Sequence, residues 1–120
     1  MRIIIAGSRQ LNPTVDFIGA AVEAFFDNFN VRPSVILSGR CRGPDQVGEL
    51  WAKQNNVQVE YYPADWNKYG KAAGPIRNRQ MAQSANGLIL IWDGISHGSQ
   101  NMLKLADEFE LATLQLVREK

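Results

Sequence analysis

The sequence contains few of the residues and motifs on which metal, thiol and cofactor chemistry commonly depend. Among 120 residues there is one cysteine, Cys41, and one histidine, His97. A single cysteine excludes an intramolecular disulfide, and no Cys and His cluster has metal-ligand spacing, so we expect neither a metal nor another cofactor. The patterns G-x-G-x-x-G and G-x-x-x-x-G-K-[ST] are also absent. Their absence argues against a typical dinucleotide-binding Rossmann site and excludes a P-loop NTPase.

Strong net charge and long apolar runs are also missing. The formal net charge is +1, which gives no overall attraction to nucleic acid or to a membrane surface, so we expect neither partner. No apolar run approaches the roughly 20 residues of a membrane span. The first residues, 1–7, are predicted to form a strand rather than a signal peptide. With the single cysteine, these features predict a cytoplasmic protein.

Alternating strand and helix patterns are present along the whole chain. With 45% hydrophobic and 21% charged residues, residues 1–120 are predicted to form a single globular domain. Pro13 suits the first turn of a helix, with Asn12 as its N-cap. The handedness of strand–helix–strand crossovers favours an α/β fold, a doubly wound and mostly parallel five-stranded sheet with helices on both faces. The predicted strands are 2–6, 34–37, 57–62, 87–92 and 113–117; the predicted helices are 13–29, one from 44, one from 75, and 99–109, with a loop over 63–74.

Glycine, serine and arginine concentrate where the predicted strands end. In an open parallel sheet these ends meet at one edge, where ligands bind. Glycine allows close backbone approach, helix N-termini favour anions, and arginine supplies forked donors. This pattern predicts a pocket for a phosphorylated small molecule of nucleotide type. The candidate ligand-binding residues are Gly7, Ser8, Arg9, Ser38, Gly39, Arg40, Arg42, Gly43, Asp65, Trp66, Arg77, Asn78, Asp93, Gly94, Ser96, Gly98 and Ser99.

Several of these residues have a second, structural interpretation. Residues 94–98 match the G-x-S-x-G pattern of serine hydrolases, but His97 is adjacent to Ser96 and is badly placed as its base. Glycines that shape a loop, with Ser96 or Ser99 capping the next helix, explain the pattern better. Asp45 could be a surface carboxylate in the first turn of a helix, or an acid–base or ribose-binding group. Cys41 is more simply an inert small residue than a nucleophile.

Several segments together form a pattern that is specific in order and spacing. They are 6–9, the pattern Ser38-Gly39-x-x-Arg42-Gly43-x-Asp45, 63–66, 69–74, Arg77-Asn78 with Met81, and 92–98. In these segments the chain resembles the YspA/YpsA-related branch of the SLOG superfamily, which also includes the LOG phosphoribohydrolases and the DNA-processing protein DprA. The resemblance implies a single Rossmann-like nucleotide-binding domain, acting as a ligand sensor, sponge or processing protein, including in phage and mobile-element biology.

Two positions depart from the family pattern. Arg40 and Cys41 stand where the family usually has two small residues, and Met102 stands where the LOG enzymes carry a catalytic glutamate. Cleavage of a nucleotide N-glycosidic or phosphoribosyl bond would therefore need another carboxylate, and Asp93 and Asp45 are the catalytic candidates. Single-strand DNA binding of DprA type is a further alternative. The sequence leaves open a homodimer or a higher homo-oligomer.

Overall fold

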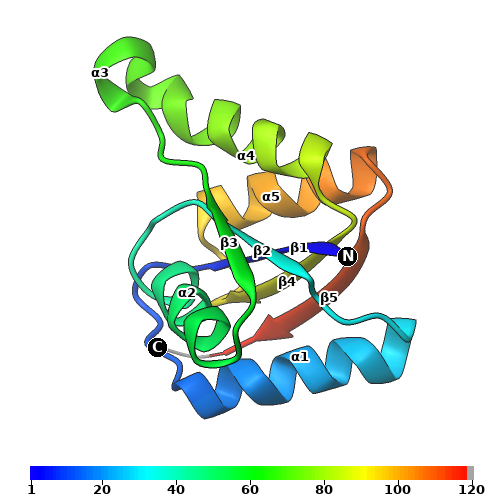
Figure 1. The fold of residues 1–120 in the computed structure, drawn as a ribbon. Coiled ribbons are helices and arrows are strands. Elements are labelled where there is room, and N and C mark those ends of the chain that lie inside the picture. Colours follow the sequence, from blue (N-terminus) through cyan, green and yellow to red (C-terminus); the bar gives the residue numbers. More distant parts are fainter. Residues whose placement is uncertain (119–120) are drawn as a thin grey trace.

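The computed structural model describes residues 1–118 as a sheet covered by helices on both faces (Figure 1). All four strand pairings are parallel, and the five strands run in the order β3-β2-β1-β4-β5. This confirms the predicted α/β fold. The elements are β1 Arg2–Gly7, α1 Val15–Phe29, β2 Val35–Ser38, α2 Pro44–Gln54, β3 Gln58–Tyr61, α3 Trp66–Tyr69, the 3-10 turn η1 Gly70–Ala72, α4 Ala73–Ser84, β4 Gly87–Trp92, α5 His97–Glu108 and β5 Ala112–Val117.

Two hydrophobic cores lie on opposite faces of the sheet. Successive side chains of a strand point to opposite faces, so Ile3 and Ile5 pack under α1 and α2, whereas Ile4 packs under α4 and α5. All three isoleucines are fully buried. This double burial explains why β1 is continuously apolar in the sequence rather than alternating. No helix within residues 1–118 is long and apolar enough to cross a membrane.

Three helices start two residues away from the predicted positions: α1 begins later, at Val15, and α4 and α5 begin earlier, at Ala73 and His97. Helix α1 begins at Val15 because the Thr14 hydroxyl caps it, accepting a hydrogen bond from the amide of Phe17 at 3.0 Å. The segment 63–74, predicted to be a loop, contains α3, η1 and the start of α4. The Asp65 side chain caps α3 by accepting from the amide of Lys68 at 3.1 Å. Pro75 lies in the first turn of α4, where its missing N–H breaks no helical hydrogen bond.

Helix α2 buries small and polar residues more deeply than its large apolar ones. Val47 and Trp51 pack partly buried against the core and Leu50 is 46% exposed, whereas Asp45, Gly48 and Ala52 are buried. Gly48 allows the close approach, because a Cβ there would lie 2.8 Å from a side-chain carbon of Ile5. A small residue, rather than a large apolar one, therefore sets how α2 sits on the sheet.

The strand order places a topological switch point between β1 and β4. From β1 the chain moves outward to β2 and β3, and later from β4 to β5 on the other side. The loops after β1 and β4 therefore leave the sheet toward opposite faces, which opens a crevice at the carboxyl edge between them.

Candidate functional site

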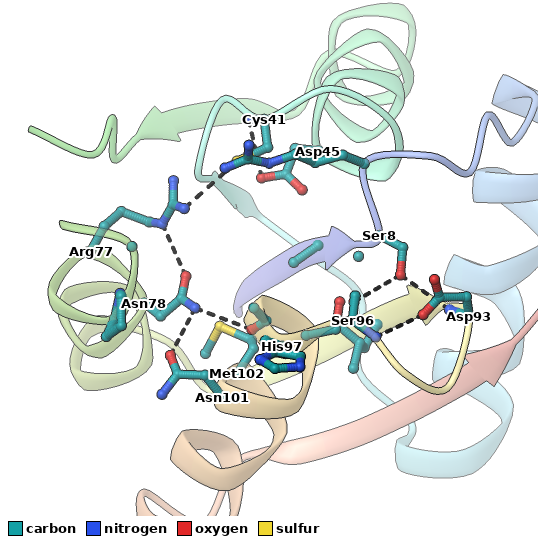
Figure 2. A pocket seen from close by; sticks show the side chains of 18 of the residues that line it. Ser8, Cys41, Asp45, Arg77, Asn78, Asp93, Ser96, His97, Asn101 and Met102 are labelled. Atoms are coloured by element: carbon teal, nitrogen blue, oxygen red, sulfur yellow. Dashed lines mark hydrogen bonds between the residues drawn. The ribbon is translucent and has the colours of Figure 1, made fainter. Parts of the chain in front are cut away.

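A cleft of about 770 Å³ lies at this edge, within the size range of small-molecule sites (Figure 2). Its walls come from the loops after β1 and β4, from the starts of α2, α4 and α5, and from Trp66 of α3. The structure brings eleven of the predicted site residues together here. They are Gly7, Ser8, Arg9, Asp45, Trp66, Arg77, Asn78, Asp93, Ser96, Gly98 and Ser99.

Ser8 and Asp93 join the two loops of the switch point. The Ser8 side chain, which is 3% exposed, accepts a hydrogen bond from the amide of Asp93 at 3.1 Å. Its hydroxyl also lies 2.9 Å from the hydroxyl of Ser96. Asp93 Oδ1 accepts from the amides of Ile95 and Ser96 at 3.0 and 2.9 Å, so this carboxylate fixes the loop before α5. Ser96 occupies the N-cap position of α5, but its side chain makes no capping hydrogen bond and turns to Ser8 instead.

Arg77 and Asn78 form the wall opposite, on α4. Arg77 is 7% exposed and donates to the carbonyl of Gly39 at 2.6 Å and to the side-chain oxygen of Asn78 at 2.9 Å. A second guanidinium nitrogen lies 3.6 Å from the sulfur of Cys41. Asn78 in turn donates to the side chain of Asn101 at 3.0 Å. Arg77 therefore ties the loop after β2 to α4, and Asn78 extends the network to α5.

Asp45 is a buried carboxyl in the cleft wall. It is 4% exposed, and its Oδ2 accepts from the amide of Cys41 at 3.4 Å. Burial raises its pKa to about 7, although the charge of Arg77 and the amides of Cys41 and Gly39 act to lower the pKa. A carboxyl that holds or releases its proton near neutral pH suits general acid–base chemistry.

A second, smaller hollow of about 300 Å³ adjoins the cleft. We call it the arginine hollow, because Arg9, Arg40, Arg42 and Arg77 all line it, together with Gly39, Cys41, Pro63, Ala64 and Trp66. Arg40 has a positive φ of 62°, and its guanidinium lies 4.6 Å from the centre of the Tyr61 ring. Three further predicted residues, Gly39, Arg40 and Arg42, thus lie in this hollow rather than in the main cleft.

Comparison with known proteins identifies the family. Residues 1–69, more than half of the chain, match the family model described as "YspA, cpYpsA-related SLOG family". The chain belongs to this SLOG family. It is 30% identical over 115 residues to the Gene 61 protein of Mycobacterium phage D29, with 89% of each protein covered.

The same fold is found in a solved structure. The chain superimposes on DNA processing protein A (DprA) from Streptococcus pneumoniae with a TM-score of 0.71 and 19% sequence identity. The match covers 95% of this chain and 49% of DprA, so the SLOG-family chain spans about half the length of that protein. At this identity the likeness establishes the Rossmann-like fold alone.

Four predicted site residues of the SLOG-family chain line neither the cleft nor the arginine hollow. Ser38 is fully buried and donates to Glu49 at 2.5 Å, while Asp65 caps α3. Gly43 and Gly94 have φ values of +82° and +86°, which other residues adopt only with strain. In the structure these four residues fix the backbone around the site.

Sequence reasoning missed several residues that line the cleft. Asn101 was not a candidate, yet it bonds to Asn78 and lies one helical turn after His97, so i, i+4 spacing on α5 would have found it. Met102, where the LOG enzymes carry glutamate, lines the cleft with a side chain that cannot transfer a proton. Lys71 does not follow a strand, and no pattern in the neighbouring sequence indicates that it lines the cleft. Within residues 1–118, no group of three His, Cys, Asp or Glu side chains is placed to hold a metal ion.

Proposed function

We propose that this SLOG-family chain binds a nucleotide or nucleotide-derived ligand in the switch-point cleft. The observation that carries the proposal is the first turn of α5, which opens onto the cleft at the point where the sheet order reverses. His97, Gly98 and Ser99 are the first residues of this helix, so their amides have no partner within it. Such amides bind phosphate, aided by the helix dipole.

The other walls supply what a nucleoside needs. Asn78 offers an amide and Asp45 a carboxyl, the groups that hydrogen-bond to ribose hydroxyls, and both line the cleft. Trp66 lines the same cleft and is half exposed, so its ring is open to stacking with a base. Phosphate, ribose and base each have a suitable group in one cleft.

Gly98 provides a sharp test. A Cβ added there would meet no atom within 4 Å, so a side chain at this position begins in open space. We expect Gly98→Glu to weaken nucleotide binding at least tenfold, because its carboxylate repels the ligand phosphate. Gly98→Gln, of the same shape without the charge, should weaken it less. Calorimetric titration with AMP, ADP, NAD, ADP-ribose and cyclic nucleotides measures both effects. Failure of the wild-type protein to bind any of them would refute the proposal.

Hydrolysis of the ligand is a second candidate function, which the buried carboxyl of Asp45 supports. With a pKa of about 7 it could donate a proton to a departing base while water attacks the ribose carbon. Long incubation with AMP and NAD, followed by chromatography, tests this. Turnover that is lost in Asp45→Asn supports it, whereas unchanged substrates at high protein concentration limit the chain to binding.

A further inference from the structure

We propose that the ligand carries two phosphate-bearing units, and that the arginine hollow binds the second. The inference rests on the proposed function, because the first unit occupies the adjoining switch-point cleft. The ligand class is a dinucleotide joined through phosphate, either free or as the 5′ end of a single strand. Both sources present the same chemistry to the protein: two phosphates separated by a sugar, with a base that lies between the switch-point cleft and the arginine hollow.

The charge around the arginine hollow points to an anion. Four arginines line it, and no Asp or Glu of residues 1–118 does. Two carboxyls lie behind this lining: Glu49 is 3.9 Å from Nε of Arg40, and the buried Asp45 contacts the amide of Cys41 at 3.4 Å. Four like charges around a volume of about 300 Å³ repel one another, and a bound phosphate removes that repulsion.

Several of these guanidiniums retain unused donors. In the described part of the chain, the Arg9 and Arg42 side chains make no hydrogen bond or ion pair within the protein; Arg9 only lies over Trp66, at 5.9 Å from the ring centre. Arg40 is held over the Tyr61 ring, which orients its guanidinium without using its N–H donors. The hollow therefore combines positioned charge with free hydrogen-bonding capacity.

The cleft and the arginine hollow share part of their lining. Arg9, Cys41, Trp66 and Arg77 line both of them. Trp66 stands at this junction with half of its surface exposed, where a base between two phosphates could stack on the ring. A mononucleotide seated in the main cleft would leave the arginine hollow unfilled, whereas a dinucleotide places its second phosphate there.

The test compares one phosphate unit with two. Calorimetric or fluorescence titrations would use AMP, dAMP as the single unit with the same sugar as the strands, the 5′-phosphorylated dinucleotide pdApdA and the longer strand pdApdApdApdA. We expect the dinucleotide to bind at least tenfold more tightly than AMP, with a steeper salt dependence. In single strands each phosphate contact contributes about 0.7 to the slope of log affinity against log salt. Similar affinities for the dinucleotide and the longer strand indicate a free dinucleotide; much tighter binding of the strand indicates a strand end.

Variants locate the second phosphate. Arg40→Gln/Arg42→Gln should abolish the advantage of the dinucleotide over AMP and reduce its salt slope. The matched control is Arg32→Gln/Arg79→Gln, which also removes two positive charges, from exposed side chains that pair with Glu23 and Glu108 and line neither the cleft nor the arginine hollow. Equal affinities of the wild-type protein for AMP and pdApdA would overturn this inference and leave the proposed function standing. Binding of neither would overturn this inference, and it would overturn the proposed function as well if ADP, NAD, ADP-ribose and the cyclic nucleotides also failed to bind.

Discussion

At the scale of single residues, Asp45 should make the stability of the protein depend on pH. Burial raises its pKa from 3.8 to about 7 in the folded state. Between these values the folded protein binds more protons than the unfolded chain, so the free energy of unfolding falls as pH rises and levels off above about pH 7. Each unit of pKa difference corresponds to about 1.4 kcal/mol. Urea unfolding at pH 5, 6, 7 and 8 should show this decline.

Asp45→Asn isolates the effect, because asparagine has nearly the same shape and no proton to release in this range. We expect the variant to lose most of the decline between pH 5 and 8 and to be more stable than the wild-type protein at pH 8. Asp107→Asn, at an exposed position of α5, serves as the control and should keep the wild-type decline. An undiminished decline in Asp45→Asn would assign the pH dependence to other groups.

The burial of Asp45 beside Arg77 could not be predicted from the sequence. Asp45 and Arg77 were both candidates, but a carboxylate in the first turn of a helix is ordinarily a surface group. Its burial depends on Gly39, which lets two side chains from distant segments approach. A Cβ on Gly39 would lie 2.6 Å from a nitrogen of Arg77 and 3.0 Å from Oδ2 of Asp45. A pattern within one short segment of sequence cannot indicate that Asp45 and Arg77, which are far apart in the chain, approach each other.

At the scale of elements, the pairing of β1 with β4 depends on Gly7. A Cβ there would lie 1.8 Å from the carbonyl oxygen of Ile91, a backbone atom in a fully buried strand that cannot move aside. Overpacked core sites commonly cost about 1–3 kcal/mol, and a clash with rigid backbone exceeds that range. We therefore expect Gly7→Ala to destabilise the protein by at least about 3 kcal/mol, as measured by urea unfolding.

Gly98→Ala is the comparison for that variant, since it also adds one methyl group but meets no atom within 4 Å. Its stability should equal that of the wild-type protein or exceed it by up to about 1 kcal/mol, because alanine favours helix over glycine. If the two alanine variants were equally stable, close approach of β1 and β4 at Gly7 would not be a determinant of the fold.

Elements were predicted well wherever apolar residues are continuous. The strands β1 and β4 are buried on both faces and appear in the sequence as unbroken apolar runs. Helix starts were harder to predict, because Asn12 and Thr14 are both acceptable caps and only packing selects between them. The segment 63–74 lacked an apolar stripe, and none of the residues of α3 and η1 is buried. Its short helices depend on a local cap at Asp65, a weaker signal than hydrophobic periodicity.

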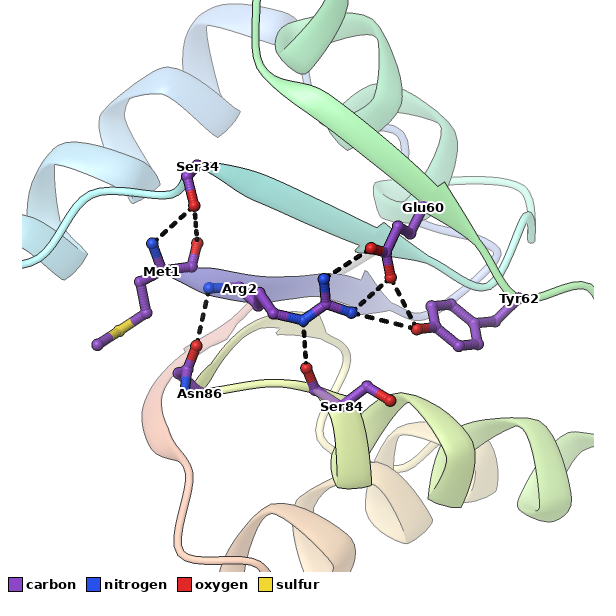
Figure 3. Close-up of polar contacts among 7 residues, drawn as sticks. All are labelled: Met1, Arg2, Ser34, Glu60, Tyr62, Ser84 and Asn86. Carbon is purple, nitrogen blue, oxygen red and sulfur yellow. Dashed lines mark hydrogen bonds and ion pairs between the residues drawn. The ribbon is translucent and has the colours of Figure 1, made fainter.

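At the scale of the whole molecule, a polar network joins segments that are distant in the sequence (Figure 3). Arg2, at the start of β1, contacts Glu60 of β3 through two hydrogen bonds of 2.5 and 2.6 Å. The same guanidinium donates to the carbonyl of Ser84 at the end of α4, and the Tyr62 hydroxyl donates to Glu60 at 2.9 Å. These contacts connect the edge strand β3, the central strand β1 and α4, and neither Arg2 nor Glu60 lines the cleft or the arginine hollow.

Removing this network should lower global stability without affecting the site. Hydrogen bonds from Arg2 and Tyr62 lower the pKa of Glu60 to about 2. The ionised carboxylate therefore contributes fully to the free energy of unfolding above about pH 4.5, and this contribution disappears as pH falls through about 2. We expect Glu60→Gln to destabilise the protein by about 1 kcal/mol at pH 7, near the upper end for exposed pairs, and to match the wild-type protein below pH 2.

Glu23→Gln provides the matched control for that measurement. Glu23 lies in α1 and pairs with Arg32 of the loop that follows this helix, and both side chains are more than half exposed. This variant should cost less, since its pair is screened by water and does not join β1, β3 and α4. Urea unfolding of both variants at pH 7 compares them. Equal losses would mean that the Arg2–Glu60 contact acts as an ordinary surface pair, and that the hydrophobic cores alone hold β3 and α4 to the central sheet.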